Sequence, residues 1–175
     1  MKNGIIFRQV EEKDAYSWVT LKNMVWRDAY KDIFPEEVFL EKERTVEERV
    51  KSFAERIYNN DQKIAYVAEY KDEIVGLMFG TINSNYDYFK DEYADLVALY
   101  INPKFQGNGI AHKFKEIFIK WAKEQGADKF VIGVLKDNHK ARKVYEVWGG
   151  KLVDYETDFY QLEKPYKEVF YVYDI

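Results

Sequence analysis

The most constraining feature of the sequence is an apolar run that passes through a glycine-containing turn directly into an amphipathic helix. The run Leu99–Ile101 leads into the turn 102–109, and apolar residues then recur at intervals of three and four. Such intervals place side chains on one face of a helix. That face holds Phe114, Ile117, Phe118, Trp121 and Ala122. Because Gly126 follows at the usual end position, the segment predicts a strand, a tight turn and a helix over 111–125.

The rest of the chain alternates between strand-like and helix-like patterns. Strands are expected over 4–10, 63–70, 73–83, 94–101, 129–135, 151–155 and 167–174, and helices over 11–27, from Pro35, over 46–59 and over 138–148. This order predicts an α/β domain on a mixed sheet. No linker, repeat or low-complexity tract interrupts the 175 residues, so we expect a single domain over 1–175.

Charge and residue usage exclude several functional classes. The chain has 27 Lys+Arg and 31 Asp+Glu, a net charge of −4, without a basic block. We therefore expect no sequence-independent binding of nucleic acid, which requires clustered positive charge. Cysteine is absent, so disulfides, thiolate metal sites and cysteine nucleophiles are excluded. The two histidines, His112 and His139, lack metal-ligand spacing, and we expect no metal site.

Hydropathy predicts a protein without a membrane segment. No stretch approaches the roughly 18 apolar residues of a membrane span. The three apolar residues Ile5–Phe7 are too few for the core of a signal peptide. We therefore expect no membrane partner and a soluble, cytoplasmic protein.

The turn before the predicted helix has the chemistry of an anion site. Gly107 and Gly109 lack Cβ atoms, so the backbone can turn closely and point its amide N–H groups into one concavity. That concavity lies at the positive end of the helix dipole, where a phosphate or pyrophosphate binds well. Tight packing of the connection is an alternative reason for the same glycines. A dinucleotide fingerprint would need Gly or Ala at His112, and a P-loop would need Lys after its last glycine, where Ile110 stands.

Two motifs in this half of the chain resemble those of the GNAT superfamily of acyl-CoA-dependent N-acetyltransferases. The run Gln106-Gly107-Asn108-Gly109-Ile110-Ala111 matches Gln/Arg-x-x-Gly-x-Gly/Ala at the strand-to-helix junction. The run 138–149 matches Asn-x-x-Ala-x-x-x-Tyr on a following helix that ends in glycine. The resemblance is specific over 63–155 and covers the remainder only as a topology. It implies a mixed, mostly antiparallel central sheet flanked by helices, with a splayed strand pair that holds acetyl-CoA.

The resemblance assigns cofactor contacts to three segments. Leu99, Tyr100 and Ile101 would lie on the splayed strand, whose freed backbone groups bind the pantetheine arm. The amides of residues 106–111 would hold the pyrophosphate. Asn138 resembles a residue that bonds the pantetheine arm, and local physics offers it a second role as the cap of its helix.

The resemblance also implies a general acid. Tyr145 matches the family residue that protonates the departing CoA thiolate, and its place on an apolar helix face also suits a ring of the core. Because no cysteine is present to carry an acyl group, the amine should attack acetyl-CoA directly in a ternary complex.

A general base is needed because an amine of pKa about 10 is mostly protonated at neutral pH. Asp95, eleven residues before Gln106, has the register of a strand glutamate that serves as base in related histone acetyltransferases. Aspartate is one methylene shorter, which favours a route through water. An ordinary solvated carboxylate at a strand end is the alternative.

The acceptor pocket of the resembling family lies along the first two helices and the loop before the central strand. There Trp26 and Tyr30 stand one helical turn apart and precede Glu36-Glu37. Rings flanked by carboxylates suit a cationic amine, which favours a polyamine-like small molecule, and packing of the rings in the core is the alternative. A protein or peptide N-terminus or a lysine is a second acceptor class. A non-catalytic CoA-binding sensor is the alternative function.

The sequence allows either a monomer or a homodimer. Val169–Tyr173 is rich in aromatic and β-branched residues, and at an exposed sheet edge it would pair with a second copy to give a homodimer. Cover by other strands of the same chain is the alternative.

Overall fold

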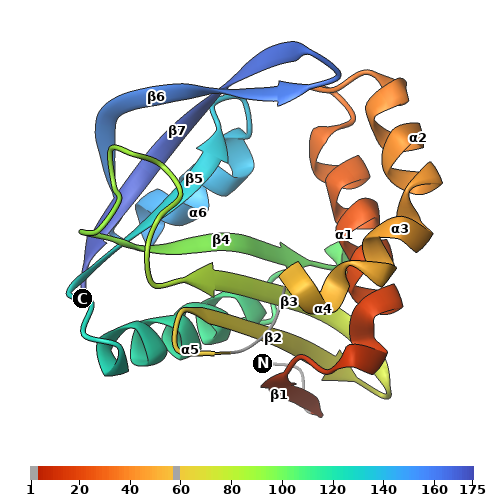
Figure 1. Ribbon diagram of the computed structural model, residues 1–175, viewed down its shortest axis with the longest axis horizontal. Coiled ribbons are helices and arrows are strands. Elements are labelled where there is room, and N and C mark those ends of the chain that lie inside the picture. The colour runs from red at the N-terminus through yellow and green to blue at the C-terminus, as the bar shows by residue number, and fades with distance from the viewer. Residues whose placement is uncertain (1–3, 57–59) are drawn as a thin grey trace.

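The strands form one seven-stranded sheet in the order β1-β2-β3-β4-β5-β7-β6 (Figure 1). The computed structural model describes residues 4–56 and 60–175. The strands are β1 (Ile5–Gln9), β2 (Lys63–Tyr70), β3 (Glu73–Thr81), β4 (Ala94–Ile101), β5 (Lys129–Leu135), β6 (Lys151–Gln161) and β7 (Lys164–Asp174). Neighbouring strands run antiparallel except β4 and β5, which are parallel. The prediction of a mixed, mostly antiparallel sheet is confirmed.

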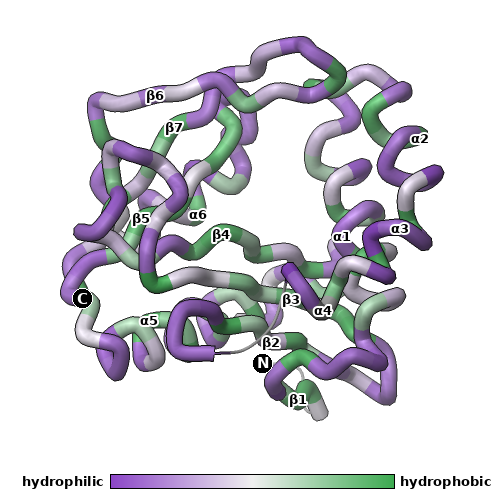
Figure 2. Tube along the Cα trace, in the orientation of Figure 1, coloured by the Kyte–Doolittle hydropathy of each residue, from purple (hydrophilic) through white to green (hydrophobic). Residues whose placement is uncertain are grey.

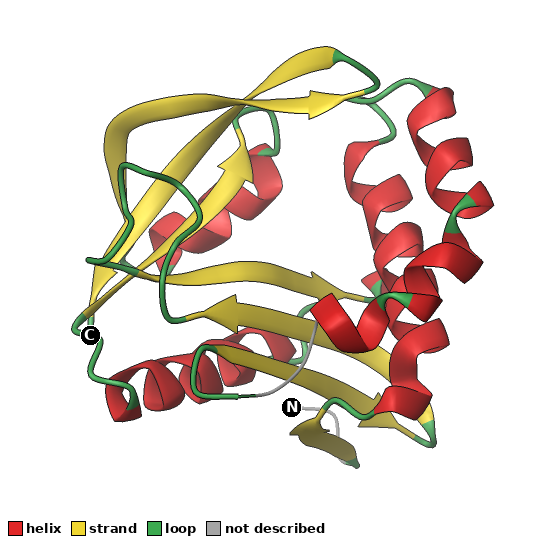
Figure 3. Ribbon diagram, viewed as in Figure 1, coloured by secondary structure: helices red, strands yellow, loops and turns green. Residues whose placement is uncertain are grey.

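Helices cover both faces of this sheet (Figure 3). They are α1 (Ala15–Tyr30), α2 (Glu36–Arg44), α3 (Val46–Lys51), α4 (Phe53–Arg56), α5 (Ile110–Glu124) and α6 (His139–Val147). α1 packs on β2 and β3 through Trp18, Leu21 and Val25. α5 packs on the opposite face through Phe114 and Phe118. The glycine turn after β4 therefore carries the chain from the sheet to α5, on the face opposite α1.

The predicted apolar face of α5 is confirmed. Phe114, Phe118 and Ala122 are fully buried, and burial of each ring contributes about 2–3 kcal/mol. A Cβ on Gly80 would clash with the Phe118 ring, so glycine in β3 allows the helix to approach the sheet closely. In Figure 2, hydrophobic residues predominate along the central strands, and many residues of α2 and α3 are hydrophilic. This packing fixes the N-terminus of α5 against the end of β4.

The C-terminal hairpin is longer than the sequence patterns indicate. The strands expected over 151–155 and 167–174 extend to β6 and β7, which meet at Leu162 and Glu163. Leu162 and Glu163 both have positive φ, 47° and 64°. Glycine or asparagine is usual at such positions, so these two residues did not indicate a turn. β7 lies between β5 and β6. The prediction of an exposed edge at Val169–Tyr173 is therefore wrong, and cover within the chain is confirmed.

The first helices also depart from the sequence prediction. α1 starts at Ala15 because the Asp14 carboxylate bonds the backbone N–H of Glu11 and supports a 3-10 turn before the helix. The helix expected over 46–59 is divided into α3 and α4, and residues 57–59 lie outside the described part of the chain. None of the described helices is long and apolar enough to cross a membrane.

Candidate active site

The sheet opens between β4 and β5. These parallel strands pair only at Ala94 with Phe130 and at Asp95 with Val131, and then diverge. Val97 lies on an interior strand and is nevertheless 44% exposed, because β4 has lost its β5 partner at this point. The predicted splay is confirmed.

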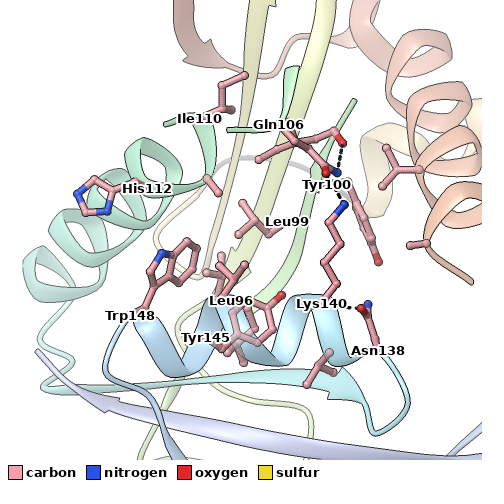
Figure 4. A pocket seen from close by; sticks show the side chains of 18 of the residues that line it. Leu96, Leu99, Tyr100, Gln106, Ile110, His112, Asn138, Lys140, Tyr145 and Trp148 are labelled. Carbon is pink, nitrogen blue, oxygen red and sulfur yellow. Dashed lines mark hydrogen bonds between the residues drawn. The ribbon is translucent and has the colours of Figure 1, made fainter. Parts of the chain in front are cut away.

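A cavity of about 570 Å³ occupies this opening (Figure 4). Its walls come from β4, β5, the turn before α5, α6 and the end of α1. It brings together most of the predicted site residues: Tyr30, Leu99, Tyr100, Ile101, Gln106, Gly107, Gly109, Ile110, Ala111, Asn138 and Tyr145. Trp26, Asp95 and Asn108 do not line it, whereas Asp28 and Lys140, which the motifs did not indicate, do.

The turn before α5 fits a phosphate group. Gly107 and Gly109 have φ of 75° and 78°, which residues with a Cβ rarely adopt. The backbone amides of 107–109 donate a hydrogen bond to no residue within 4–56 or 60–175, and no side chain there caps α5. Unpaired N–H groups at a helix N-terminus attract anions. The Asn108 side chain donates to the carbonyls of Phe105 and Gln106 and thereby supports the turn itself.

Replacement of Gly109 tests this placement. We expect Gly109→Val to weaken CoA binding by about 10-fold or more, because a β-branched residue at positive φ shifts the turn and its amides. Isothermal titration with CoA measures the change. Gly126→Val is the matched control, since Gly126 has φ of 90° and lies at the other end of α5. Unchanged CoA affinity in Gly109→Val, at the same stability as the control, would contradict the placement.

The first turn of α6 borders the same cavity. The Asn138 carboxamide oxygen accepts a hydrogen bond from the backbone N–H of Ala141 at 3.1 Å, so Asn138 caps the helix while it lines the cavity. Lys140 Nζ donates to Gln106 Oε1 at 2.7 Å and connects α6 to the turn before α5. This contact adds a positive charge beside the unpaired amides of the turn, which favours a phosphate there.

Tyr145 reaches from α6 into the cavity toward Leu96 on β4 (Figure 4). Its backbone carbonyl accepts a hydrogen bond from the Tyr173 hydroxyl at 2.8 Å, which ties α6 to β7. Burial raises the pKa of the Tyr145 hydroxyl above its usual value. The hydroxyl therefore keeps its proton at neutral pH and is available as a proton donor.

Asp95 lies at the closed end of the opening. Its carboxylate is buried and accepts a hydrogen bond from Ser84 Oγ at 2.8 Å. Burial raises the pKa of Asp95 to about 7, and the charge of Glu168 adds to the rise. Because Asp95 does not line the cavity, any contact with an acceptor would have to pass through water or through another group.

This raised pKa makes stability depend on pH. The folded protein holds the Asp95 proton up to about pH 7, whereas the unfolded chain releases it near pH 3.8. The contribution of Asp95 to stability therefore falls as pH rises through this window. We expect Asp95→Asn, which can still accept from Ser84, to raise Tm at pH 8 by roughly 4 °C or more, with the gain vanishing toward pH 4. Thermal unfolding across this range checks it, and a pH-independent difference would contradict it.

A second carboxylate, Glu168 on β7, was not indicated by the sequence motifs. Glu168 Oε2 accepts a hydrogen bond from the Tyr86 hydroxyl at 2.7 Å. A Cβ built on Gly133 would lie 2.8 Å from Glu168 Oε1, so the carboxylate rests against a glycine that lines the cavity. Burial raises the pKa of Glu168. A partly exposed carboxylate with this pKa shift, beside the opening of the sheet, is suited to accept a proton.

Trp26 and Tyr30 belong to an aromatic cluster at the end of α1. Their ring centres lie 5.1 Å apart, and the Trp26 ring also contacts Phe34 and Phe159. Tyr30 lines the cavity, whereas Trp26 is buried behind it. Lys42 Nζ lies 4.2 Å from the centre of the Trp26 ring. The protein's own lysine therefore already makes the cation–π contact that was expected from the sequence for a cationic amine.

The opened sheet, the turn with unpaired backbone amides and the cavity between them are the features expected of an acyl-CoA-dependent transferase. The sequence profile described as the Acetyltransferase (GNAT) family matches residues 18–149, and the chain belongs to that family. No curated protein matches the sequence. Membership in the family means that the protein is an acetyltransferase.

Solved structures share the fold over nearly the whole chain. PaiA N-acetyltransferase from Thermoplasma acidophilum, in complex with coenzyme A, has 18% identity and a TM-score of 0.67, covering 94% of this chain and 98% of that one. An N-acetyltransferase from Staphylococcus aureus Mu50 has 19% identity and a TM-score of 0.71, with 98% and 99% covered. A GCN5-related N-acetyltransferase from Rhodopseudomonas palustris has 14% identity and a TM-score of 0.75, with 100% and 98% covered.

Proposed function

We propose that the protein transfers the acetyl group of acetyl-CoA to a primary amine of a small molecule in a ternary complex. The observation that carries the proposal is the cavity that runs from the unpaired amides before α5, through the opened β4–β5 pair, to Tyr145 and Tyr30. Bound acetyl-CoA would supply the activated acyl group as a thioester. Since the sequence contains no cysteine, a cysteinyl acyl-enzyme is excluded and the amine attacks directly.

The proposed roles follow from where each side chain lies. The amides of Gly107 and Gly109 hold the pyrophosphate, and the edge of β4 freed after Asp95 offers backbone groups to the pantetheine arm. Tyr145 donates its proton to the departing sulfur. Glu168, which lies against the lining residue Gly133, receives the proton of the acceptor amine through water; Asp95, which lies deeper, is the alternative acceptor of that proton, also through water.

Acetyl transfer to a peptide N-terminus or lysine, and CoA binding without turnover, are the competing assignments. Calorimetric titration with CoA followed by thiol release against polyamines, amino acids, aminoglycosides and N-terminal peptides separates them. Turnover on one small-molecule class supports the proposal, turnover only on peptides contradicts it, and binding without turnover on any amine identifies a sensor.

Three further expectations belong to the proposal. We propose that residues 1–175 act as one domain and that the enzyme works in the cytoplasm. We also propose a homodimer, in which a second copy pairs at an outer strand of the sheet, β6 or β1, since β7 is covered. Light scattering in solution measures the last of these.

A further inference from the structure

Three basic side chains, Lys22, Lys42 and Arg49, gather where α1, α2 and α3 meet; they do not line the cavity themselves, and the Tyr100 ring connects them to it. Lys22 Nζ lies 5.7 Å from the ring centre of Tyr100, a residue that lines the cavity, and 5.9 Å from that of Trp26. Lys42 lies over the same Trp26 ring. Arg49 donates to the Asn23 side chain at 2.8 Å and to the backbone carbonyl of Lys42 at 3.2 Å. Three elements therefore direct positive charge toward one place.

No carboxylate neutralises this cluster. Within the described residues, none of the three cations has an Asp or Glu oxygen within 4 Å. Three acidic residues of α2 have other partners: Glu36 and Glu43 pair with Arg27, and Glu41 pairs with Arg44. These three carboxylates are thus paired with other cations, and the charge of Glu41 acts on Lys42 without forming an ion pair with it.

The arrangement is unfavourable in the protein alone. Burial, together with the charges of Arg49, Lys42 and Arg56, lowers the pKa of Lys22 to about 8. Burial likewise lowers the pKa of Lys42 and of Arg49. Half-buried like charges without a counter-ion cost free energy, which a bound anion would recover. Glu168, on β7, carries the opposite charge, and that charge adds to the rise in the pKa of the Tyr100 hydroxyl that burial mainly causes.

We propose that the acceptor amine carries an anionic group, a carboxylate or a phosphate, which Lys22, Lys42 and Arg49 bind while the amine lies toward Glu168. This inference rests on the proposed function and names its substrate class. It moves the expected acceptor away from a polyamine, because a polycation would place its second charge against three cations. Tyr100, which lines the cavity and lies beside Lys22, would mark the anion end of the acceptor.

Binding to the CoA-saturated protein provides the test, because CoA occupies the phosphate site before α5. The probes are ω-amino carboxylates and ω-aminoalkyl phosphates of two to six carbons, the alkylamines of equal length and the corresponding diamines, each measured by calorimetry. We expect at least one anionic amine to bind about 10-fold or more tightly than its alkylamine. Tighter binding of the carboxylate or of the phosphate series identifies the anion. Equal binding, or preference for diamines, overturns the inference.

Variants separate the anion site from general damage. Lys22→Met and Arg49→Met should each lose about 10-fold in affinity for the anionic amine and leave the alkylamine unchanged. Lys51→Met, which removes the same charge from an exposed position on α3, is the control. Because Lys22→Met replaces an unpaired half-buried cation by an apolar chain, its Tm should equal or exceed that of the wild type. Unchanged affinity in a folded Lys22→Met variant contradicts the inference.

Thiol release with the same probes keeps the two proposals distinguishable. If anionic amines bind through Lys22 but none is acetylated, the anion site stands and the proposed transfer fails. If amines are acetylated without regard to their anionic group, the transfer stands and the anion site fails.

Discussion

Tyr145→Phe is expected to lower kcat by about 10²–10⁴-fold while the affinity for CoA stays within about 2-fold of the wild type. The physical reason is that burial keeps the Tyr145 hydroxyl protonated and the cavity gives it access to the reacting centre. The phenylalanine ring keeps the packing of Tyr145 against Tyr171 and Trp148, so the fold should not change. Steady-state thiol release and CoA titration measure the two quantities.

Tyr171→Phe is the matched control, because Tyr171 is a buried tyrosine next to α6 that does not line the cavity. It loses hydrogen bonds with Glu146 and Arg142 and should therefore lose stability with little change in kcat. Equal loss of kcat in both variants would mean that Tyr145 acts through packing alone, and an unchanged rate in Tyr145→Phe would remove it from the mechanism.

Much of the fold could be predicted because its signals are local. The bounds of β2, β4 and β5 agree with the runs expected over 63–70, 94–101 and 129–135. The strands expected over 63–70 and 73–83 leave only the polar pair Lys71-Asp72 between them, and both residues adopt the positive φ that a tight hairpin turn needs. The β6–β7 hairpin turns through Leu162 and Glu163, which give no such signal.

The site residues that could be predicted are likewise those in local motifs. The turn over 106–111 and the first turn of α6 are contiguous motifs, and the structure brings them to one cavity. Glu168 could not be found in this way, because its hydrogen-bond partner Tyr86 lies 82 residues earlier and Gly133 comes from a third segment. Likewise, the contact of Lys42 with Trp26 depends on how α2 packs on α1. The sequence alone could not show this contact, so it suggested Trp26 and Tyr30 as a site for a cationic amine.

Asp95 and Glu168 are the two candidates for the general base, and their positions favour Glu168. Neither side chain lines the cavity: Asp95 is buried at the closed end of the opening, whereas Glu168 is partly exposed and lies against Gly133, which does line it. Their charges interact, since Glu168 contributes to the raised pKa of Asp95. Two coupled carboxylates resist simultaneous ionisation, so the exposed one gives up its proton more readily to solvent and accepts the proton of the amine.

Glu168→Gln is accordingly expected to lower kcat/KM at pH 7 by about 10²-fold or more. Glutamine can still accept from the Tyr86 hydroxyl, so the local structure is preserved. The defect should shrink as pH rises toward the pKa of the amine, because a neutral amine no longer needs a base. Rates of thiol release from pH 6 to 10 measure both effects.

Glu156→Gln, on the neighbouring strand β6, is the control, because Glu156 is exposed and, within residues 4–56 and 60–175, forms a salt bridge with Lys136 alone. It should leave the rate unchanged at every pH. A Glu168→Gln defect that is independent of pH would indicate a structural role. A large, pH-dependent defect in Asp95→Asn together with a normal rate in Glu168→Gln would transfer the base to Asp95, since the loss must follow whichever carboxylate receives the proton.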